Sequence, residues 1–177
     1  MDSEKRHLEA NGEINQLISF AVGEEEYGLD ILKVKEVIRI REITRLPKAP
    51  SFVRGIINLR GDVIPIVDLR DRFGLENKEY TEMTRVIVVD VESKLVGMVV
   101  DSASQVVRIP EDQIDPPPPI VGGLSAEYIK GVGKIDQRLV ILLNIDRILS
   151  DPEKEELGKV MERAVVAPQP AAVGAAS

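Results

Sequence analysis

An internal repeat constrains the fold of this chain more than any other feature of the sequence. The segment QLISFAVGEEEYGLDILKVKEVIRI, residues 16–40, aligns without a gap to RVIVVDVESKLVGMVVDSASQVVRI, residues 85–109, at a shift of 69. In this alignment Gly28 falls on Gly97. The period is too long for a solenoid, whose repeats run to about 20–50 residues. The alignment therefore indicates one small unit that is used twice.

A second matched block extends the repeat. FVRGI at 52–56 aligns with YIKGV at 128–132, at a shift of 76. The extra residues fall near DPPPPIVGG at 115–123, a stretch that neither a strand nor a helix would hold, because proline donates no backbone hydrogen bond. Each unit has the size of a small β-barrel. The alternative is a chance alignment of two stretches rich in Ile and Val.

Short apolar runs predict strands within each unit, since they are too short to indicate helices. The predicted strands cover 17–22, 55–59, 63–67 and 86–91. A turn at 60–62 joins two of them, and Gly61 supplies the positive φ that such a turn needs.

The segment after Gly28 has two interpretations. Ile31, Val34 and Ile38 have helical spacing, whereas the aligned stretch DSASQVVRI favours a turn followed by a strand. The sequence alone leaves both open.

Helices are predicted at three places where an Asp or Asn side chain can accept hydrogen bonds from first-turn N–H groups. Asp68 is expected to cap LRDRF, and Asn144 to cap IDRIL. Asp151 is expected to cap a longer C-terminal helix over about 152–164. The apolar stripe of that helix should pack on a barrel or, alternatively, bind a partner. The stripe consists of Leu157, Val160, Met161 and Ala164.

Composition narrows the class of function. The net charge of −7 and the aromatic share of 3% argue against a nucleic-acid partner, which needs a basic face and stacking rings. The apolar share of 44% supports an aliphatic core, and the absence of cysteine excludes disulfides. The longest aliphatic run, Leu139 to Leu143, is far too short for membrane insertion. Residues 1–14 are expected to be flexible, and residues 165–177 to form a disordered tail.

No credible catalytic set can be assembled from the sequence. The single histidine, His7, lies in the flexible N-terminus, whereas a general base needs a fixed position. The glycine-rich GVGK at 131–134 lacks the spacing of a phosphate loop. Asp90 and Asp101 fall at predicted strand ends, where acidic side chains usually lie in solvent. We therefore expect a non-enzymatic binding module with no cofactor and no metal.

Three long stretches carry a resemblance to a known family. GLDILKVKEVIRI, LPKAPSFVRGIINLRGDVIPIVDLRDRFG and LSAEYIKGVGKIDQRLVILLNIDRIL resemble the CheW family of bacterial chemotaxis coupling proteins, over roughly 15–149. The resemblance implies a mainly β fold, with two SH3-like five-stranded barrels packed together, a short helix after each and a C-terminal helix. A CheW-like domain over 15–164 would divide into subdomains at about 15–83 and 84–150.

The resemblance also implies a function. Such a protein is a cytoplasmic adaptor that links the tips of methyl-accepting chemoreceptors to the regulatory domain of the histidine kinase CheA, and it is recruited to membrane receptor arrays. The alternatives are a double-barrel scaffold with other partners, a small β-barrel enzyme or ligand binder, and, least compatible with the charge, a nucleic-acid barrel.

Arg60 is the strongest candidate for receptor binding, because a planar guanidinium suits carboxylates and carbonyls. Glu36 is its expected partner, since the family fold brings the two segments together. The pair either fixes a loop or faces the receptor. In the second unit KIDQ replaces NLRG, so Arg60 is special to the first unit. The other expected members of the site are aliphatic receptor contacts (Val34, Val37 and Val106) and structural residues (Gly55, Asn58, Gly61 and Asp68).

Overall fold

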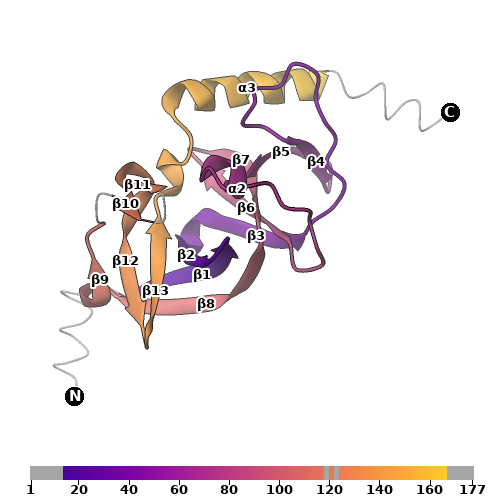
Figure 1. Ribbon diagram of the computed structural model, residues 1–177. Coiled ribbons are helices and arrows are strands. Elements are labelled where there is room, and N and C mark those ends of the chain that lie inside the picture. Colours follow the sequence, from indigo (N-terminus) through magenta and orange to yellow (C-terminus); the bar gives the residue numbers. More distant parts are fainter. Residues whose placement is uncertain (1–13, 118–119, 122–123, 167–177) are drawn as a thin grey trace.

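The computed structural model describes residues 14–117, 120–121 and 124–166 (Figure 1). Two predicted segments, the flexible N-terminus and the Ala- and Pro-rich tail, fall almost entirely outside these residues. Part of the proline-rich stretch at 115–123 lies outside them as well. The described chain is mainly β, as the sequence predicts, and its two sheets curl into SH3-like barrels.

The first barrel is a five-stranded sheet in the order β3–β6–β7–β5–β4. Its strands are β3 (Val34–Arg39), β4 (Gly55–Leu59), β5 (Asp62–Asp68), β6 (Arg85–Val91) and β7 (Lys94–Val100). The strands predicted at 55–59, 63–67 and 86–91 are confirmed to within one residue at each end.

The second barrel is a six-stranded sheet in the order β8–β1–β2–β13–β12–β9. Its strands are β1 (Ile14–Val22), β2 (Glu25–Asp30), β8 (Ser102–Pro110), β9 (Ile114–Asp115), β12 (Ile129–Ile135) and β13 (Arg138–Leu143). A separate pair, β10 (Ile120–Val121) with β11 (Leu124–Ser125), precedes β12. Apart from the two-residue β9, the second barrel has the five strands that were expected.

The repeat is present, but the predicted boundary near residue 83 does not separate the two barrels. The hairpin β1–β2 of the first repeat lies in the second barrel, and its counterpart β6–β7 lies in the first. With this exchange the two barrels have the same strand order, because β8, β1, β2, β13 and β12 are the repeat counterparts of β3, β6, β7, β5 and β4. Gly28 and Gly97 occupy equivalent places, where β2 pairs with β13 and β7 with β5 in parallel.

Short connections explain the exchange. Asp101 alone joins β7 to β8, and the three residues of η1 (Ile31–Lys33) join β2 to β3. An antiparallel hairpin needs a loop of about two residues to reverse the chain. Because one residue cannot reverse it, the chain continues from β7 across into β8 of the other sheet. The three residues of η1 form a 3-10 turn instead of a hairpin loop, and β3 likewise enters the other sheet. The segment after Gly28 is thus one 3-10 turn and then a strand, which resolves the ambiguity in the sequence.

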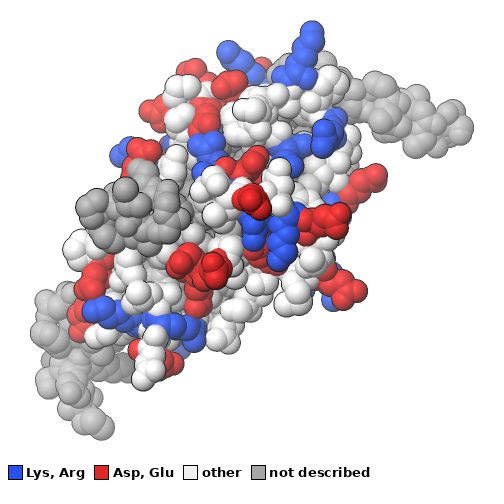
Figure 2. Space-filling view, viewed as in Figure 1, with Lys and Arg blue, Asp and Glu red and all other residues white. Residues whose placement is uncertain are grey.

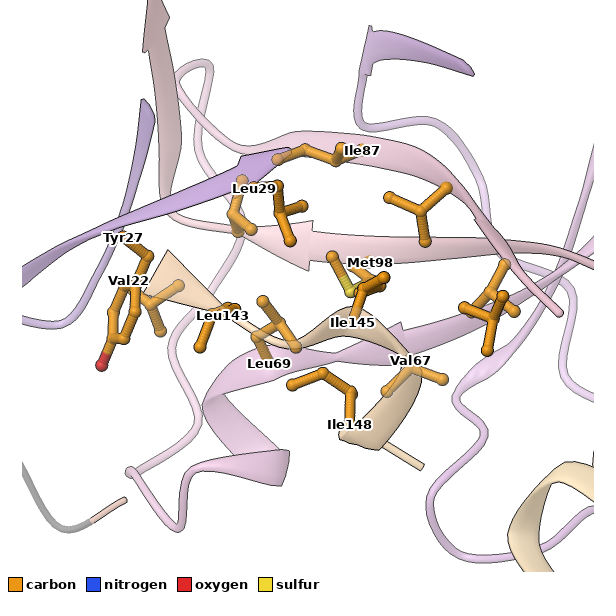
Figure 3. Close-up of a cluster of buried hydrophobic side chains, with 14 of the residues drawn as sticks. Val22, Tyr27, Leu29, Val67, Leu69, Ile87, Met98, Leu143, Ile145 and Ile148 are labelled. Carbon is orange, nitrogen blue, oxygen red and sulfur yellow. The ribbon is translucent and has the colours of Figure 1, made fainter. Parts of the chain in front are cut away.

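The apolar residues form three clusters, of which the largest lies between the barrels. It takes Tyr27 and Leu29 from the second barrel and Val67, Ile87 and Met98 from the first (Figure 3). The other two clusters fill the barrels themselves. Ile57, Leu59, Ile64, Ile66, Val86, Val88 and Val99 fill the first, and Leu17, Val107, Ile109, Val140 and Leu142 fill the second. A large apolar interface of this kind holds the barrels as one unit.

Helices cover the junctions. The described helices are α2 (Leu69–Arg72), α3 (Asp151–Val166) and the 3-10 turns η1, η2 (Glu111–Gln113), η3 (Ala126–Tyr128) and η4 (Ile145–Arg147). The prediction for Asp68 is confirmed, because its Oδ1 accepts a hydrogen bond from the Arg70 amide at 2.9 Å. The prediction for Asn144 is wrong, because its side chain makes no cap hydrogen bond. Its backbone N–H donates to the Tyr128 carbonyl.

The C-terminal helix α3 packs against β5 and lies above β4, β5 and β7 in Figure 1. Leu157 and Val160 are buried, and Leu157 belongs to the cluster between the barrels, so this part of the predicted apolar stripe packs on the barrels. The side chain of Ala164 lies outside the described residues. The cap, however, is Ser150 rather than Asp151. The Glu153 amide donates to Ser150 Oγ at 3.3 Å, and the Ser150 amide donates to Glu153 Oε1 at 2.8 Å. This reciprocal capping box starts the helix one residue earlier than expected.

Candidate protein-binding surface

The turn between β4 and β5 presents Arg60 on a constrained backbone. Arg60 and Gly61 have φ angles of 54° and 92°, the left-handed pair that suits a two-residue hairpin. Asn58 Oδ1 accepts a hydrogen bond from the Gly61 amide at 2.9 Å and closes the turn. Arginine is uncommon at positive φ, whereas Asn and Gly adopt this conformation at lower cost. The backbone alone therefore does not explain an arginine at this position.

Arg60 forms a bidentate ion pair with Glu36 of β3. Its two terminal nitrogens donate to the Glu36 carboxylate oxygens at 2.9 Å and 2.6 Å. The side chain of Arg60 is 72% exposed, against 26% for Glu36. The hydrogen bonds from Arg60 lower the pKa of Glu36, and the nearby charge of Arg41 adds to the effect. The expected contact between the two segments is therefore present, and one side of the guanidinium stays open to solvent.

The other expected structural residues hold the framework behind this turn. A Cβ added to Gly55 would lie 2.3 Å from the Thr44 carbonyl oxygen, so only glycine fits there. Thr44 and Ile56 exchange two backbone hydrogen bonds of 2.8 Å, which fasten the 40–54 segment to the edge of β4. Besides capping α2, Asp68 accepts a hydrogen bond from the Tyr80 hydroxyl at 3.1 Å.

The three candidate valines lie along the border of the apolar cluster between the barrels. Val37 is directly opposite Ile87 in the register of β3 and β6, and Val106 is opposite Ile18 in that of β8 and β1. Directly opposite residues of antiparallel strands share a sheet face. Ile87 belongs to the interfacial cluster and Ile18 packs against it. Both valines therefore extend this apolar face outward.

Exposure separates the three valines. Val37 is 38% exposed and Val106 48%, whereas Val34 is half-buried and packs against the interfacial cluster. Both β3 and β8 are edge strands of their sheets. The exposed valines thus lie on strands that have one open edge each.

Leu32 is a candidate that the sequence did not single out. It lies in η1, two residues before Val34, and it is 84% exposed. Asp30 accepts a hydrogen bond from its amide at 2.9 Å, and an ion pair of 3.5 Å between Lys33 and Asp146 ties the turn to η4. Leu32 does not fall in the helical spacing of the neighbouring Ile31, Val34 and Ile38, so the sequence pattern did not indicate it.

A second unexpected feature is a partly buried ion pair at the crossover between the barrels. Arg70 of α2 donates two hydrogen bonds of 2.9 Å to the carboxylate of Asp101. The Gly23 amide, from the β1–β2 hairpin, donates to the same carboxylate at 2.8 Å. The expectation that Asp101 lies in solvent is wrong. Burial opposes ionisation of Asp101, but the hydrogen bonds from Arg70 and Gly23 outweigh it and lower the pKa.

Surface charge is mixed on the face shown in Figure 2, where basic and acidic side chains are interspersed over much of the area. No helix in the part of the chain that the structure describes is long and apolar enough to cross a membrane.

Two small barrels packed through an apolar cluster define a double β-barrel module, and comparison with known proteins identifies the family. A model of the CheW-like domain matches residues 16–153. The chain is a member of the CheW-like family, as the resemblance in its sequence indicated.

Curated relatives and a solved structure agree with this assignment. The chain is 41% identical over 138 residues to the chemotaxis protein CheW of Klebsiella aerogenes, which covers 78% of this chain and 83% of the relative. It is 33% identical over 159 residues to CheW of Treponema pallidum, covering 86% and 92%. The crystal structure of the scaffolding protein TtCheW from Thermoanaerobacter tengcongensis has a TM-score of 0.73 and 35% identity, over 78% of this chain and 94% of that one.

Proposed function

We propose that the protein is a non-enzymatic adaptor that couples chemoreceptor tips to the histidine kinase CheA in chemotaxis arrays. The observation that carries the proposal is the exposed guanidinium of Arg60, held by Glu36 on a left-handed turn that an Asn or Gly would form with less strain. Membership of the CheW-like family supports it, as does the structural likeness to TtCheW, a scaffolding protein.

The receptor site comprises Arg60 with Glu36 and the apolar border formed by Val34, Val37 and Val106. Arg60 provides directional hydrogen bonds, since its guanidinium can engage a receptor carbonyl or carboxylate without leaving Glu36. The exposed valines provide apolar area on both sides of the junction between the barrels. Leu32 extends this area at the start of β3.

The proposed kinase site is the β12–β13 hairpin of the second barrel. This hairpin is the repeat counterpart of the β4–β5 hairpin, which carries Arg60 in the first barrel. Leu139 is 58% exposed there, beside the turn at Asp136. We assign this exposed leucine to contact with another small barrel, such as the regulatory domain of CheA. With the receptor site at the junction between the barrels and the kinase site on this hairpin, one molecule can hold receptor and kinase together.

The proposed location is the cytoplasm, with recruitment to the membrane arrays through the receptors. Direct insertion into the bilayer has no part in the proposal, because the adaptor would reach the array by contact with protein alone.

A reconstitution tests the proposal. Membranes that bear a chemoreceptor are mixed with CheA, ATP and the purified protein, and phosphorylation of the kinase is followed. Receptor-dependent activation on addition of the protein is the expected result. A kinase that stays at its basal rate, with no protein sedimenting alongside the membranes, would exclude the adaptor role.

A further inference from the structure

Basic residues are concentrated in one segment of an otherwise acidic protein. Residues 33–60 contain eight Lys or Arg and two Glu, a net charge of +6. The rest of the chain contains 15 basic and 28 acidic residues, a net charge of −13. Such a contrast within one chain indicates a surface with an oppositely charged partner.

The fold places Arg41 of this segment beside the Arg60 turn. Two other basic residues of the segment, Lys33 and Arg54, form ion pairs elsewhere in the molecule. The Arg41 guanidinium donates to the Asn58 carbonyl at 3.2 Å, and its charge contributes with that of Arg60 to lowering the pKa of Glu36. The Glu36 carboxylate is thus hydrogen-bonded to one guanidinium, that of Arg60, and lies within the electrostatic influence of a second, that of Arg41. Arg60 and Arg41 together carry one more charge than Glu36 alone balances.

Two further arginines face each other across the strands beside this turn. Arg39 of β3 and Arg85 of β6 are directly opposite in the register. Their side chains therefore share a sheet face, with Cβ atoms about 5 Å apart, an arrangement that is destabilising for like charges. The Arg85 guanidinium donates to the carbonyls of Glu82 and Thr84, which carry no net charge. Among the described residues, Arg39 has no ion pair with a carboxylate.

The opposed arginines lie on the face that carries the exposed valine of β3. Val37 precedes Arg39 by two residues, and alternate residues of a strand point to the same side. Val37 and Arg39 are both exposed. The exposed Val37 and a basic strip, formed by Arg39 and Arg85, therefore lie next to each other on one face at the edge strand β3.

We infer that the docking partner of this edge carries an acidic strip beside its apolar residues, and that Arg39 and Arg85 are the complementary specificity residues. The inference rests on the proposed receptor contact and names the chemistry of the receptor surface. The repulsion between the two arginines is relieved when carboxylates of the partner lie between them. Guanidinium forks are suited to bidentate pairing with carboxylates.

An acidic protein segment fits this edge better than a bilayer or a nucleic acid. The basic strip is short and adjoins apolar side chains, whereas phosphate polymers and anionic bilayers favour extended basic faces. The net charge of −7 also repels large anionic surfaces.

Association with a soluble chemoreceptor signalling fragment, measured at several salt concentrations, tests the inference. The variants are Arg39→Gln, Arg85→Gln and a control, Lys159→Gln, which removes one exposed charge from α3. Charge pairing at the edge predicts a wild-type association rate that falls steeply with added salt. Each arginine variant should associate several-fold more slowly at low salt, and the control should match the wild type.

Each possible result supports or contradicts the inference that the partner is an acidic protein segment. Arginine variants that bind like the control would overturn the inference and leave the adaptor role intact. If the wild-type protein fails to bind the fragment at every salt concentration, both the adaptor role and the inference are contradicted. Binding to vesicles rich in phosphatidylglycerol that requires Arg39 would reassign the strip to lipid.

Thermal unfolding of the variants separates recognition from folding. Because Arg39 and Arg85 repel each other, either Gln variant should melt at the same temperature as the wild type or higher. A marked fall in the melting temperature of both variants would assign the arginines to stability and contradict the inference.

Discussion

Arg70 and Asp101 form a two-point ion pair, with both nitrogen–oxygen distances at 2.9 Å, where the chain crosses from one barrel to the other. Their side chains are 17% and 19% exposed. Asp101 is the only residue between β7 and β8, and its carboxylate also holds the Gly23 amide. A single carboxylate therefore connects α2 of the first barrel, a hairpin of the second and the crossover itself.

Substitution of Asp101 should weaken this connection. Asp101→Asn keeps the size of the side chain and one acceptor oxygen but removes the charge opposite Arg70. A partly buried guanidinium that loses its partner costs about 1–3 kcal/mol. Urea denaturation should show a decrease of this size in the free energy of unfolding.

Asp90→Asn is the matched control. Asp90 accepts one hydrogen bond of 2.7 Å from the Ser93 amide, which an Asn oxygen can replace. Its free energy of unfolding should stay within about 0.5 kcal/mol of the wild type. Equal losses in the two variants would show that the ion pair with Arg70 adds nothing.

Stability should decrease in acid for a related reason. The pKa values of Asp101 and Glu153 are lowered in the folded protein, since the hydrogen bonds from Arg70 and Arg72 outweigh the effect of burial. The unfolded chain then binds more protons, so their contribution is complete above about pH 5 and disappears as pH falls through the lowered values. Urea denaturation from pH 7 to pH 3 should show this decline, and Asp101→Asn should show a smaller one. A wild-type protein as stable at pH 3 as at pH 7 would contradict the assignment.

Two leucines should respond to the same change in opposite ways. Leu157 of α3 is 1% exposed, so Leu157→Ala should lower the free energy of unfolding by about 2–5 kcal/mol. Leu32→Ala removes an exposed side chain, should change stability by less than about 0.5 kcal/mol, and should weaken receptor binding. Thermal unfolding and co-sedimentation with receptor membranes measure the two effects. Unchanged receptor binding by Leu32→Ala would remove Leu32 from the proposed site.

Leu139 provides a test of the two-site arrangement. Leu139→Ser should weaken binding to the CheA regulatory domain several-fold and leave receptor binding unchanged, because Leu139 is not among the residues of the proposed receptor site. Titration calorimetry with each partner measures both affinities. Loss of receptor binding in this variant, or an unchanged affinity for the kinase domain, would contradict the arrangement.

Local patterns predicted much of the fold, because strand length and turn chemistry are encoded nearby in sequence. The strand at 55–59 and the cap at Asp68 are examples. The SDPE signature of the capping box was also readable, although the prediction chose Asp151 instead of Ser150. The exchange of hairpins was not readable, since it depends on whether a one-residue connection can reverse the chain.

Some residues of the candidate site could likewise be predicted from the sequence, whereas others depend on the fold. Arg60 and Glu36 were paired through family resemblance, and the geometry agrees. The Arg39–Arg85 opposition and the exposure of Leu32 depend on strand register and on the orientation of a 3-10 turn. Neither property is visible in a single sequence, so these three residues became candidates only with the fold.

In the proposed adaptor Arg60 serves recognition rather than folding, and the Arg60→Asn variant separates these two roles. Asn tolerates the left-handed backbone, so the variant should unfold like the wild type. A change of about 2 kcal/mol, typical of an interface arginine, would weaken receptor binding about 30-fold. Asp136→Asn, at the equivalent turn of the second barrel, where φ is also 54°, is the control and should bind the receptor normally.

The decisive measurement is the affinity of Arg60→Asn for the receptor fragment beside its free energy of unfolding. We predict a large loss of affinity at unchanged stability. Wild-type affinity, or a loss of affinity matched by an equal loss of stability, would contradict it.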